Sequence, residues 1–294
     1  MLGAIIGDMV GSVYEFSSPK VKNFNIYNRN MRMTDDSLLT IAVAKTLLAN
    51  YPIKYDDLSL RKMQKELAVE FVAACKRKPF AGFGGMFMDW CIRCDEKGGI
   101  EPPYNSYGNG SAMRISPVGW VAHSENEVKA LSKAVSEITH NHPEGLKGAE
   151  AVAMAIYLSL RGSSKEQIRE RMINDYYPEI ANLDFNELVK SYKFNATCQK
   201  SVPQAIYCFL ISDGLEDAIR NCVAIGGDCD TTGAMAGSIA EAYYQKDRLS
   251  DFEDKYLYLM IDPGVEQFIK KFHKAIGSKK FQWANAGRIE SSAS

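Results

Sequence analysis

Residues 35–49 read DDSLLTIAVAKTLLA, and their apolar side chains follow the i, i+3, i+4 spacing of one helical face: Leu38, Leu39, Ile41, Ala42 and Leu48. The same period recurs in residues 2–13, 59–76, 125–139, 148–161, 164–172, 203–212, 215–224, 231–245 and 263–276. Residues 149–160 are apolar on nearly every side, which is typical of a buried central helix. Because no convincing alternating strand interrupts these segments, the sequence predicts an all-α fold.

The composition excludes several classes of protein. The chain has 294 residues, 46% hydrophobic and 24% charged, with a formal net charge of −1. These values are typical of a globular protein and exclude a disordered chain. The balanced charge argues against nucleic acid as a partner, since proteins that bind it carry a basic excess. No linker or repeat divides the chain, so we expect one domain over residues 1–294, with a frayed tail at 287–294.

The termini and cysteines indicate a compartment. Asp8 interrupts the apolar N-terminus and no basic segment precedes it, so no export signal is predicted. The longest apolar stretch, residues 151–160, is too short to cross a bilayer. Seven cysteines are an odd number, which favours reduced thiols, and the pair Cys91 and Cys94 has no second pair to complete a zinc site. We therefore expect a cytoplasmic protein without a membrane partner.

Two acidic segments open predicted helices. Thr34-Asp35-Asp36 begins one helix, and Asp228-Cys229-Asp230-Thr231 begins another directly after two glycines. Each segment alone is equally typical of a helix cap with an acidic first turn. Together they offer carboxylate and hydroxyl oxygens that suit Mg²⁺ or Mn²⁺, in numbers sufficient for a binuclear centre. Behind the second segment, Gly233 and Gly237 put small residues on one helix face, so another helix can approach closely.

Three loops hold further candidates. Glu15 follows the first predicted helix, where a loop can carry it toward a metal, although alone it is typical of a solvated acid. Asp8 lies inside that helix and is expected to be a structural acid or one that supports a ligand. Residues 106–110, SYGNG, either let backbone amides approach an anion such as a pyrophosphate or form a simple turn. His140 and His142 lie in a loop before the central helix, where ligand contact and helix-entry hydrogen bonding both remain open.

The five segments together, in this order, resemble the ADP-ribosylglycohydrolase family. They are GAIIGDMVGSVYEF at 3–16, MTDDS at 33–37, SYGNGSAMR at 106–114, ITHNHPEGLKGA at 138–149 and AIGGDCDTTGAMAGSIAEAYY at 224–244. The resemblance implies a compact orthogonal helical bundle around two Mg²⁺ or Mn²⁺ ions. It implies metal ligands at Thr34, Asp35, Asp36, Asp228, Asp230 and Thr231, with Asp230 bridging the ions. It implies ADP-ribose contacts at Ser106, Tyr107, Gly108, Asn109, Gly110 and His140.

The implied activity is hydrolysis of the glycosidic bond between ADP-ribose and an acceptor. Glu15 and Asp36 would transfer the protons, and the bond would break through an oxocarbenium-like state. The pattern is similar to the bacterial dinitrogenase-reductase type, which favours arginine in a modified protein over serine, a nucleobase or O-acetyl-ADP-ribose. We expect a monomer whose partner is an ADP-ribosylated protein or a small ADP-ribose conjugate.

A non-catalytic relative, either an ADP-ribose-binding module or a crystallin-like structural protein, is the alternative function. The intact acids at 35, 36, 228 and 230 argue against the structural protein. Glu15 argues against a pure binding module, because such a module needs no proton-transfer acid.

Overall fold

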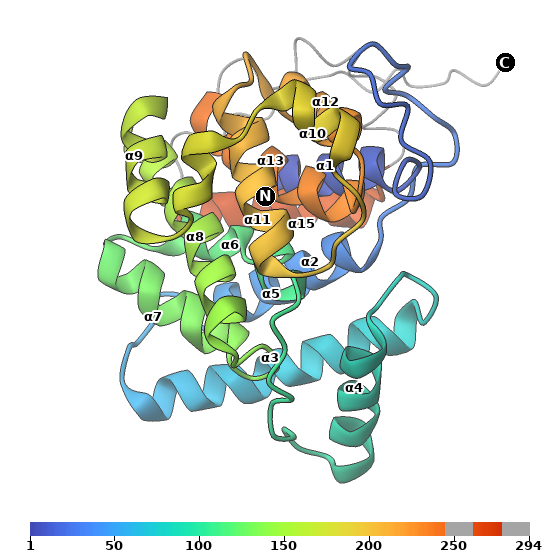
Figure 1. The fold of residues 1–294 in the computed structure, drawn as a ribbon. Helices are drawn as coiled ribbons and strands as arrows, with labels where there is room; N and C mark the ends of the chain where they lie inside the picture. The colour runs from blue at the N-terminus through green and yellow to red at the C-terminus, as the bar shows by residue number, and fades with distance from the viewer. Residues whose placement is uncertain (245–260, 278–294) are drawn as a thin grey trace, which may run out of the picture.

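The computed structural model describes residues 1–244 and 261–277, and over these residues it contains helices and no β-strand, which confirms the all-α prediction (Figure 1). The α-helices are α1 (Leu2–Gly11), α2 (Asp35–Ala49), α3 (Asp57–Arg77), α4 (Gly85–Lys97), α5 (Gly110–Met113), α6 (Ser116–Val121), α7 (Glu125–Ser136), α8 (Pro143–Leu160), α9 (Lys165–Asp175), α10 (Phe185–Ser191), α11 (Cys198–Leu210), α12 (Leu215–Ile225), α13 (Cys229–Tyr244) and α15 (Pro263–Ala275). A 3₁₀ helix spans Pro178–Asn182. The tail predicted at 287–294 lies outside the described residues. Among the helices described, none is long and apolar enough to cross a membrane.

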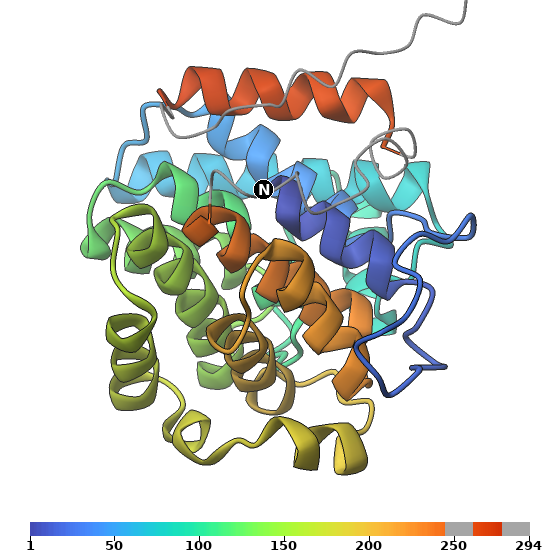
Figure 2. The same cartoon turned by 90° about the horizontal axis from the view of Figure 1, so that it is seen from above.

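Helices α1 and α13 lie side by side, although α1 opens the chain and α13 begins only at Cys229 (Figures 1 and 2). Their contact is made by glycines on both helices. A Cβ atom on Gly7 would lie 2.0 Å from the carbonyl oxygen of Gly233, and one on Gly3 would lie 2.2 Å from that of Gly237. The close approach predicted for the Gly233 and Gly237 face is therefore confirmed, and α1 is the helix that makes it.

Helix α8 is the buried central helix that the apolar run predicts. It begins at Pro143, five residues before the predicted start at 148, because His142 caps it and proline is favoured in the first turn of a helix. Its residues 151–156 are fully buried, and α6, α7, α11 and α13 pack against it.

Other helices were missed or begin elsewhere. Helices α5 and α6 are too short to show a period, α10 has a single buried residue, and α4 turns only four side chains into the core. Helix α11 begins at Cys198 rather than at the predicted residue 203, because Pro203 lies inside the helix where the sequence pattern placed a start.

The chain turns sharply between α12 and α13. Gly226 and Gly227 have φ values of +76° and +79°, a region that side chains with a Cβ rarely adopt. This turn brings the first residues of α13 next to the C-terminal half of α1, where a Cβ on Gly11 would meet the backbone of Asp230 at 2.4 Å. The first turn of α13 is thus held against the last turns of α1, and α2 packs against both helices.

Candidate active site

A cavity of about 370 Å³ lies where α2, α5 and α13 begin. Twelve of the residues that the sequence nominates line it: Glu15, Thr34, Asp35, Asp36, Ser106, Gly108, Asn109, Gly110, His140, Asp228, Asp230 and Thr231. Asp8, Tyr107 and His142 lie outside the set of lining residues, and the half-exposed Tyr107 ring packs against His142. Segments that are far apart in the sequence, from the loop after α1 to the first turn of α13, therefore meet in one cavity.

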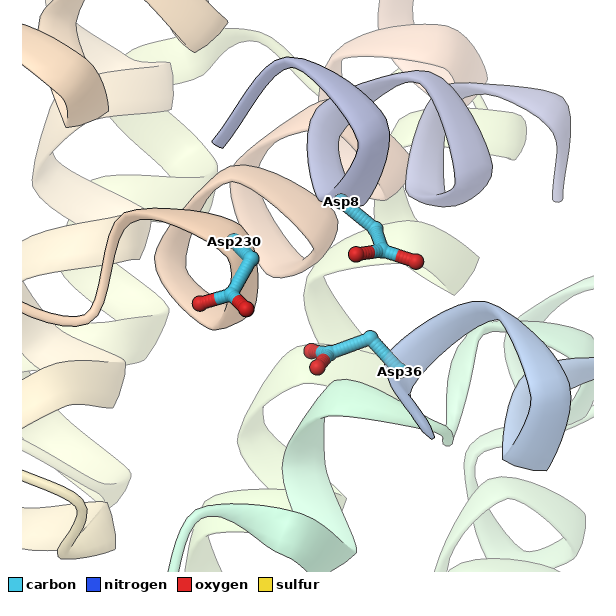
Figure 3. A group of neighbouring side chains, drawn as sticks. All are labelled: Asp8, Asp36 and Asp230. Carbon is cyan, nitrogen blue, oxygen red and sulfur yellow. The ribbon is translucent and has the colours of Figure 1, made fainter. Parts of the chain in front are cut away.

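Two groups of carboxylates, whose members other than the fully buried Asp8 line this cavity, could each hold a cation. Asp8, Asp36 and Asp230 form one group, and Glu15, Asp228 and Asp230 form the other, with the candidate ligand oxygens of each group within 4.8 Å of one another. Figure 3 shows the first three carboxylates pointing toward one another from α1, α2 and α13. Asp230 belongs to both groups, which is the position expected of a bridging residue. Asp35 belongs to neither; its Oδ1 lies over Gly82, where a Cβ would be 2.9 Å away.

Asp8 lies closer to the site than the sequence indicated. Its Oδ2 accepts hydrogen bonds from the backbone amides of Thr34 (2.9 Å) and Ser37 (3.1 Å) and from the Ser37 hydroxyl, while its Oδ1 accepts one from Thr34 Oγ1 (2.6 Å). One carboxylate on α1 therefore holds the entire first turn of α2. The signal in the sequence was the acid itself, since a fully buried aspartate inside an apolar helix requires several partners.

The Thr34-Asp35-Asp36 segment is both a helix cap and part of the cavity wall. Thr34 Oγ1 accepts from the backbone amide of Asp36 at 3.4 Å, as an N-cap does. Asp36 is 2% exposed, and its Oδ1 has no hydrogen-bond partner among the described residues. A buried carboxylate oxygen without a donor is costly, and a bound cation would satisfy it. The donor set, all oxygens and mostly carboxylates, thus fits a hard divalent ion.

The charges in and beside the cavity also favour a bound cation. Burial, and then the charge of Asp230, raise the pKa of Asp8 to about 7 and that of Asp36 well above its usual range. Burial and the charge of Asp230 also raise the pKa of Asp228 well above its usual range. Carboxylates this crowded repel one another, so positive charge placed among them would be strongly favoured.

Glu15 is placed differently from these aspartates. The loop after α1 carries it to the cavity, but its side chain stays only half-buried. Burial, and then the charge of Asp230, raise its pKa to about 7, with Arg32 opposing the shift. Glu15 therefore combines access to solvent with a pKa near neutrality, two properties of a proton-transfer group.

The 106–110 loop is hydrogen-bonded to the segment that precedes α11. The Asn109 amide donates to Ala196 O at 2.9 Å, and the Gly108 amide donates to Ser106 Oγ at 3.1 Å. These two backbone amides are therefore already engaged, so they do not form the open anion cradle that the Gly-Asn-Gly pattern indicated. The Asn109 side chain instead donates to Asp228 Oδ2 at 2.8 Å and orients that carboxylate.

His140 lies behind this loop as a neutral imidazole. Burial, and then the nearby Arg114 guanidinium, hold its pKa well below the usual value. Thr139 Oγ1 accepts from Arg114 Nη2 at 2.7 Å and lies 2.8 Å from His140 Nδ1. Which of these two groups donates depends on the tautomer of the imidazole, whose other nitrogen, Nε2, faces Gly110. That nitrogen lies 3.1 Å from the position of a Cβ on Gly110, so the glycine allows the close approach. His142, in contrast, caps α8 through Nδ1, which is the helix-entry alternative.

Comparison with known proteins places the chain among enzymes. The sequence profile described as ADP-ribosylglycohydrolase matches residues 1–272. ADP-ribosylhydrolase ARH3 of Gallus gallus is 25% identical over 85% of both chains, and the human protein of that name is 24% identical over 85% of this chain and 86% of its own. ADP-ribosyl-[dinitrogen reductase] glycohydrolase of Rhodospirillum rubrum is 23% identical over 84% of each chain.

A solved structure shares the fold. The protein named ADP-ribosylglycohydrolase-related protein complex superposes with a TM-score of 0.69 over 94% of both chains, at 20% sequence identity. Because the family profile covers nearly the whole chain and the site residues meet in one cavity, this chain belongs to the ADP-ribosylglycohydrolase family and is a glycosidic-bond hydrolase.

Proposed function

We propose that this hydrolase removes ADP-ribose from arginine side chains of modified proteins and that it works with two bound Mg²⁺ or Mn²⁺ ions. The observation that carries the proposal is the convergence of five acids and the 106–110 loop on one cavity. A non-catalytic role in ADP-ribose binding would require neither the shared Asp230 nor the half-buried Glu15 at the cavity.

The two carboxylate groups indicate which residues would hold the ions. Asp36, Asp228 and Asp230 would be carboxylate ligands, joined by Asp35 and by the hydroxyls of Thr34 and Thr231. When bound, the ions supply positive charge that balances these acids and binds ribose hydroxyls. Asp8 would position these ligands rather than bind the ions itself, since its oxygens already accept hydrogen bonds from the first turn of α2.

The protons of the reaction would be carried by Glu15 and Asp36. Cleavage requires one group that protonates the leaving side chain and one that takes a proton from water. A carboxyl group whose pKa is about 7 exchanges its proton readily near neutral pH, which suits Glu15 for this role. Asp36 lies deeper, and its Oδ1, which has no hydrogen-bond partner in the part of the chain that the structure describes, could accept a proton or a ligand.

The arginine acceptor is supported by the surroundings of Glu15. The next residue, Phe16, stacks its ring on that of Phe194, with 6.2 Å between centroids. A guanidinium is a planar cation that pairs with carboxylates and stacks on aromatic faces, so both features suit it. The Rhodospirillum relative is named for a modified protein, dinitrogen reductase, which supports a protein substrate.

A panel of defined substrates tests the proposal. ADP-ribosyl-arginine, ADP-ribosyl-serine, an ADP-ribosylated nucleobase and O-acetyl-ADP-ribose would each be incubated with the protein, with Mg²⁺ or Mn²⁺ and with a chelator, and free ADP-ribose quantified. We expect release from the arginine conjugate that depends on the metal. Equal or faster release from another conjugate would overturn the acceptor, and release in the chelator would overturn the metal centre.

A further inference from the structure

Large apolar side chains are exposed around the mouth of the active-site cavity. Phe16 is 84% exposed, Phe80 98%, Met86 61% and Phe194 51%. Met86 and Phe194 line the cavity, Phe16 follows the lining residue Glu15, and Phe80 precedes the lining residue Ala81. We call these four residues the mouth ring. They come from three segments of the chain, so the helical pattern of one segment does not explain their exposure.

A ligand that lies inside the cavity would leave part of the mouth ring uncovered. Phe16 and Phe80 are almost entirely exposed and do not line the cavity. Exposing such rings to water is unfavourable, and a partner that covered them would gain free energy from their burial. A partner that covers them must extend outward from the cavity.

We propose that the mouth ring docks the polypeptide that carries the ADP-ribose, through the residues that flank the modified side chain. This inference rests on the proposed function and adds the surface that selects a protein over a small conjugate. The ring begins next to Glu15, one of the two groups proposed to transfer protons at the bond that breaks, so the acceptor's backbone would emerge there. Stacked and exposed aromatic side chains are well suited to bury the apolar parts of such a chain.

The test compares two substrates with the same linkage, an ADP-ribosyl-arginine peptide and free ADP-ribosyl-arginine. Phe16→Ala and Phe80→Ala would be measured beside Leu58→Ala and Val69→Ala. These control positions on α3 are 81% and 67% exposed, and neither they nor their immediate neighbours line the cavity. We expect each ring variant to lower kcat/KM for the peptide about fivefold to tenfold more than for the free conjugate. We expect the controls to change neither value.

Two results would overturn the docking surface. One is an equal effect of the ring variants on peptide and free conjugate, including no effect on either. The other is a dimer in sedimentation that dissociates in the ring variants, which would assign the ring to a second copy of this chain.

A binding measurement separates this inference from the proposed function. If the wild-type protein released ADP-ribose from neither substrate, the proposed function would fail. Fluorescence anisotropy of the labelled ADP-ribosylated peptide on Glu15→Gln would then still decide the docking surface. Weaker binding with Phe16→Ala added supports it, and unchanged binding contradicts it.

Discussion

The glycine contact between α1 and α13 makes a strong prediction for Gly7→Ala. In an isolated helix this change is favourable by about 1 kcal/mol, because alanine is the better helix former. Here the new Cβ would lie 2.0 Å from the Gly233 oxygen and 2.3 Å from the Gly233 carbonyl carbon, whereas ordinary contact begins at 3.4 Å. The partner atoms are backbone, so no side chain can rotate away and the two helices themselves must move apart.

The clash should outweigh the gain in helix propensity. Overpacking a tight core costs typically about 1–3 kcal/mol, and a backbone partner puts this case at the upper end. We therefore expect a net loss of about 2 kcal/mol or more, which lowers the Tm by about 3 °C or more for a protein of this size. Because Asp8 is the next residue and Asp230 lies one turn from Gly233, the separation would also pull apart carboxylates now within 4.8 Å.

The assay combines thermal unfolding in chelator with calorimetric titration of Mn²⁺. Gly3→Ala is the comparison, since it makes a similar clash at 2.2 Å but lies one turn farther from Asp8. It should lose stability and retain more of its affinity for metal. Gly99→Ala is the control, because no atom of residues 1–244 or 261–277 lies within 4 Å of the Cβ that it would add. A Gly7→Ala protein with the wild-type Tm and wild-type metal affinity would refute the link between glycine packing and the site.

Three further predictions concern the acids. Asp230→Ala should abolish binding of both ions and turnover together, whereas Asp228→Ala should leave one ion bound, because only Asp230 belongs to both carboxylate groups. Calorimetric titration would measure the number of ions that each variant binds. Full activity of Asp35→Ala or Asp230→Ala in chelator would contradict the metal centre. Asp8→Asn should weaken metal binding about tenfold by loosening the first turn of α2, which is a typical cost of losing a residue that orients ligands. A metal affinity equal to that of the wild-type protein would show that Asp8 is not needed to orient the ligands. The metal-free protein should lose stability as pH rises. Burial and a neighbouring aspartate raise the pKa of Asp8 to about 7 and of Asp35 to about 8, so the folded state holds these protons more tightly than the unfolded chain. The resulting stability is complete below the unfolded value of 3.8 and is lost as pH rises through 7 to 8. The Tm in chelator should therefore fall between pH 5 and 8.5 and recover with Mn²⁺. A Tm that rises over this pH range would contradict the prediction.

Much of the fold is readable from short stretches of sequence. The long helices were predicted because their apolar period is local, and the two acidic helix starts were found because capping chemistry depends on residues within one turn. The short helices α5 and α6 could not be found this way, since four and six residues are too few to display a period. Helix α4 was missed because the chain turns only one narrow stripe of it into the core.

The set of oxygen-bearing residues, and the helices that carry them, can be read from local patterns in the chain. Which of these residues meet depends on how the helices pack. The tertiary structure placed Asp8 beside Asp36 and Asp230, left Asp35 outside both carboxylate groups, engaged the Gly108 and Asn109 amides, and left Tyr107 outside the cavity lining. The physical reason is that helix periods and caps arise from neighbours in the chain, whereas distances between carboxylates depend on how helices from distant parts of the sequence pack. Here that packing is set by glycine contacts between α1 and α13, and burial then raises the pKa values of the acids that it brings together.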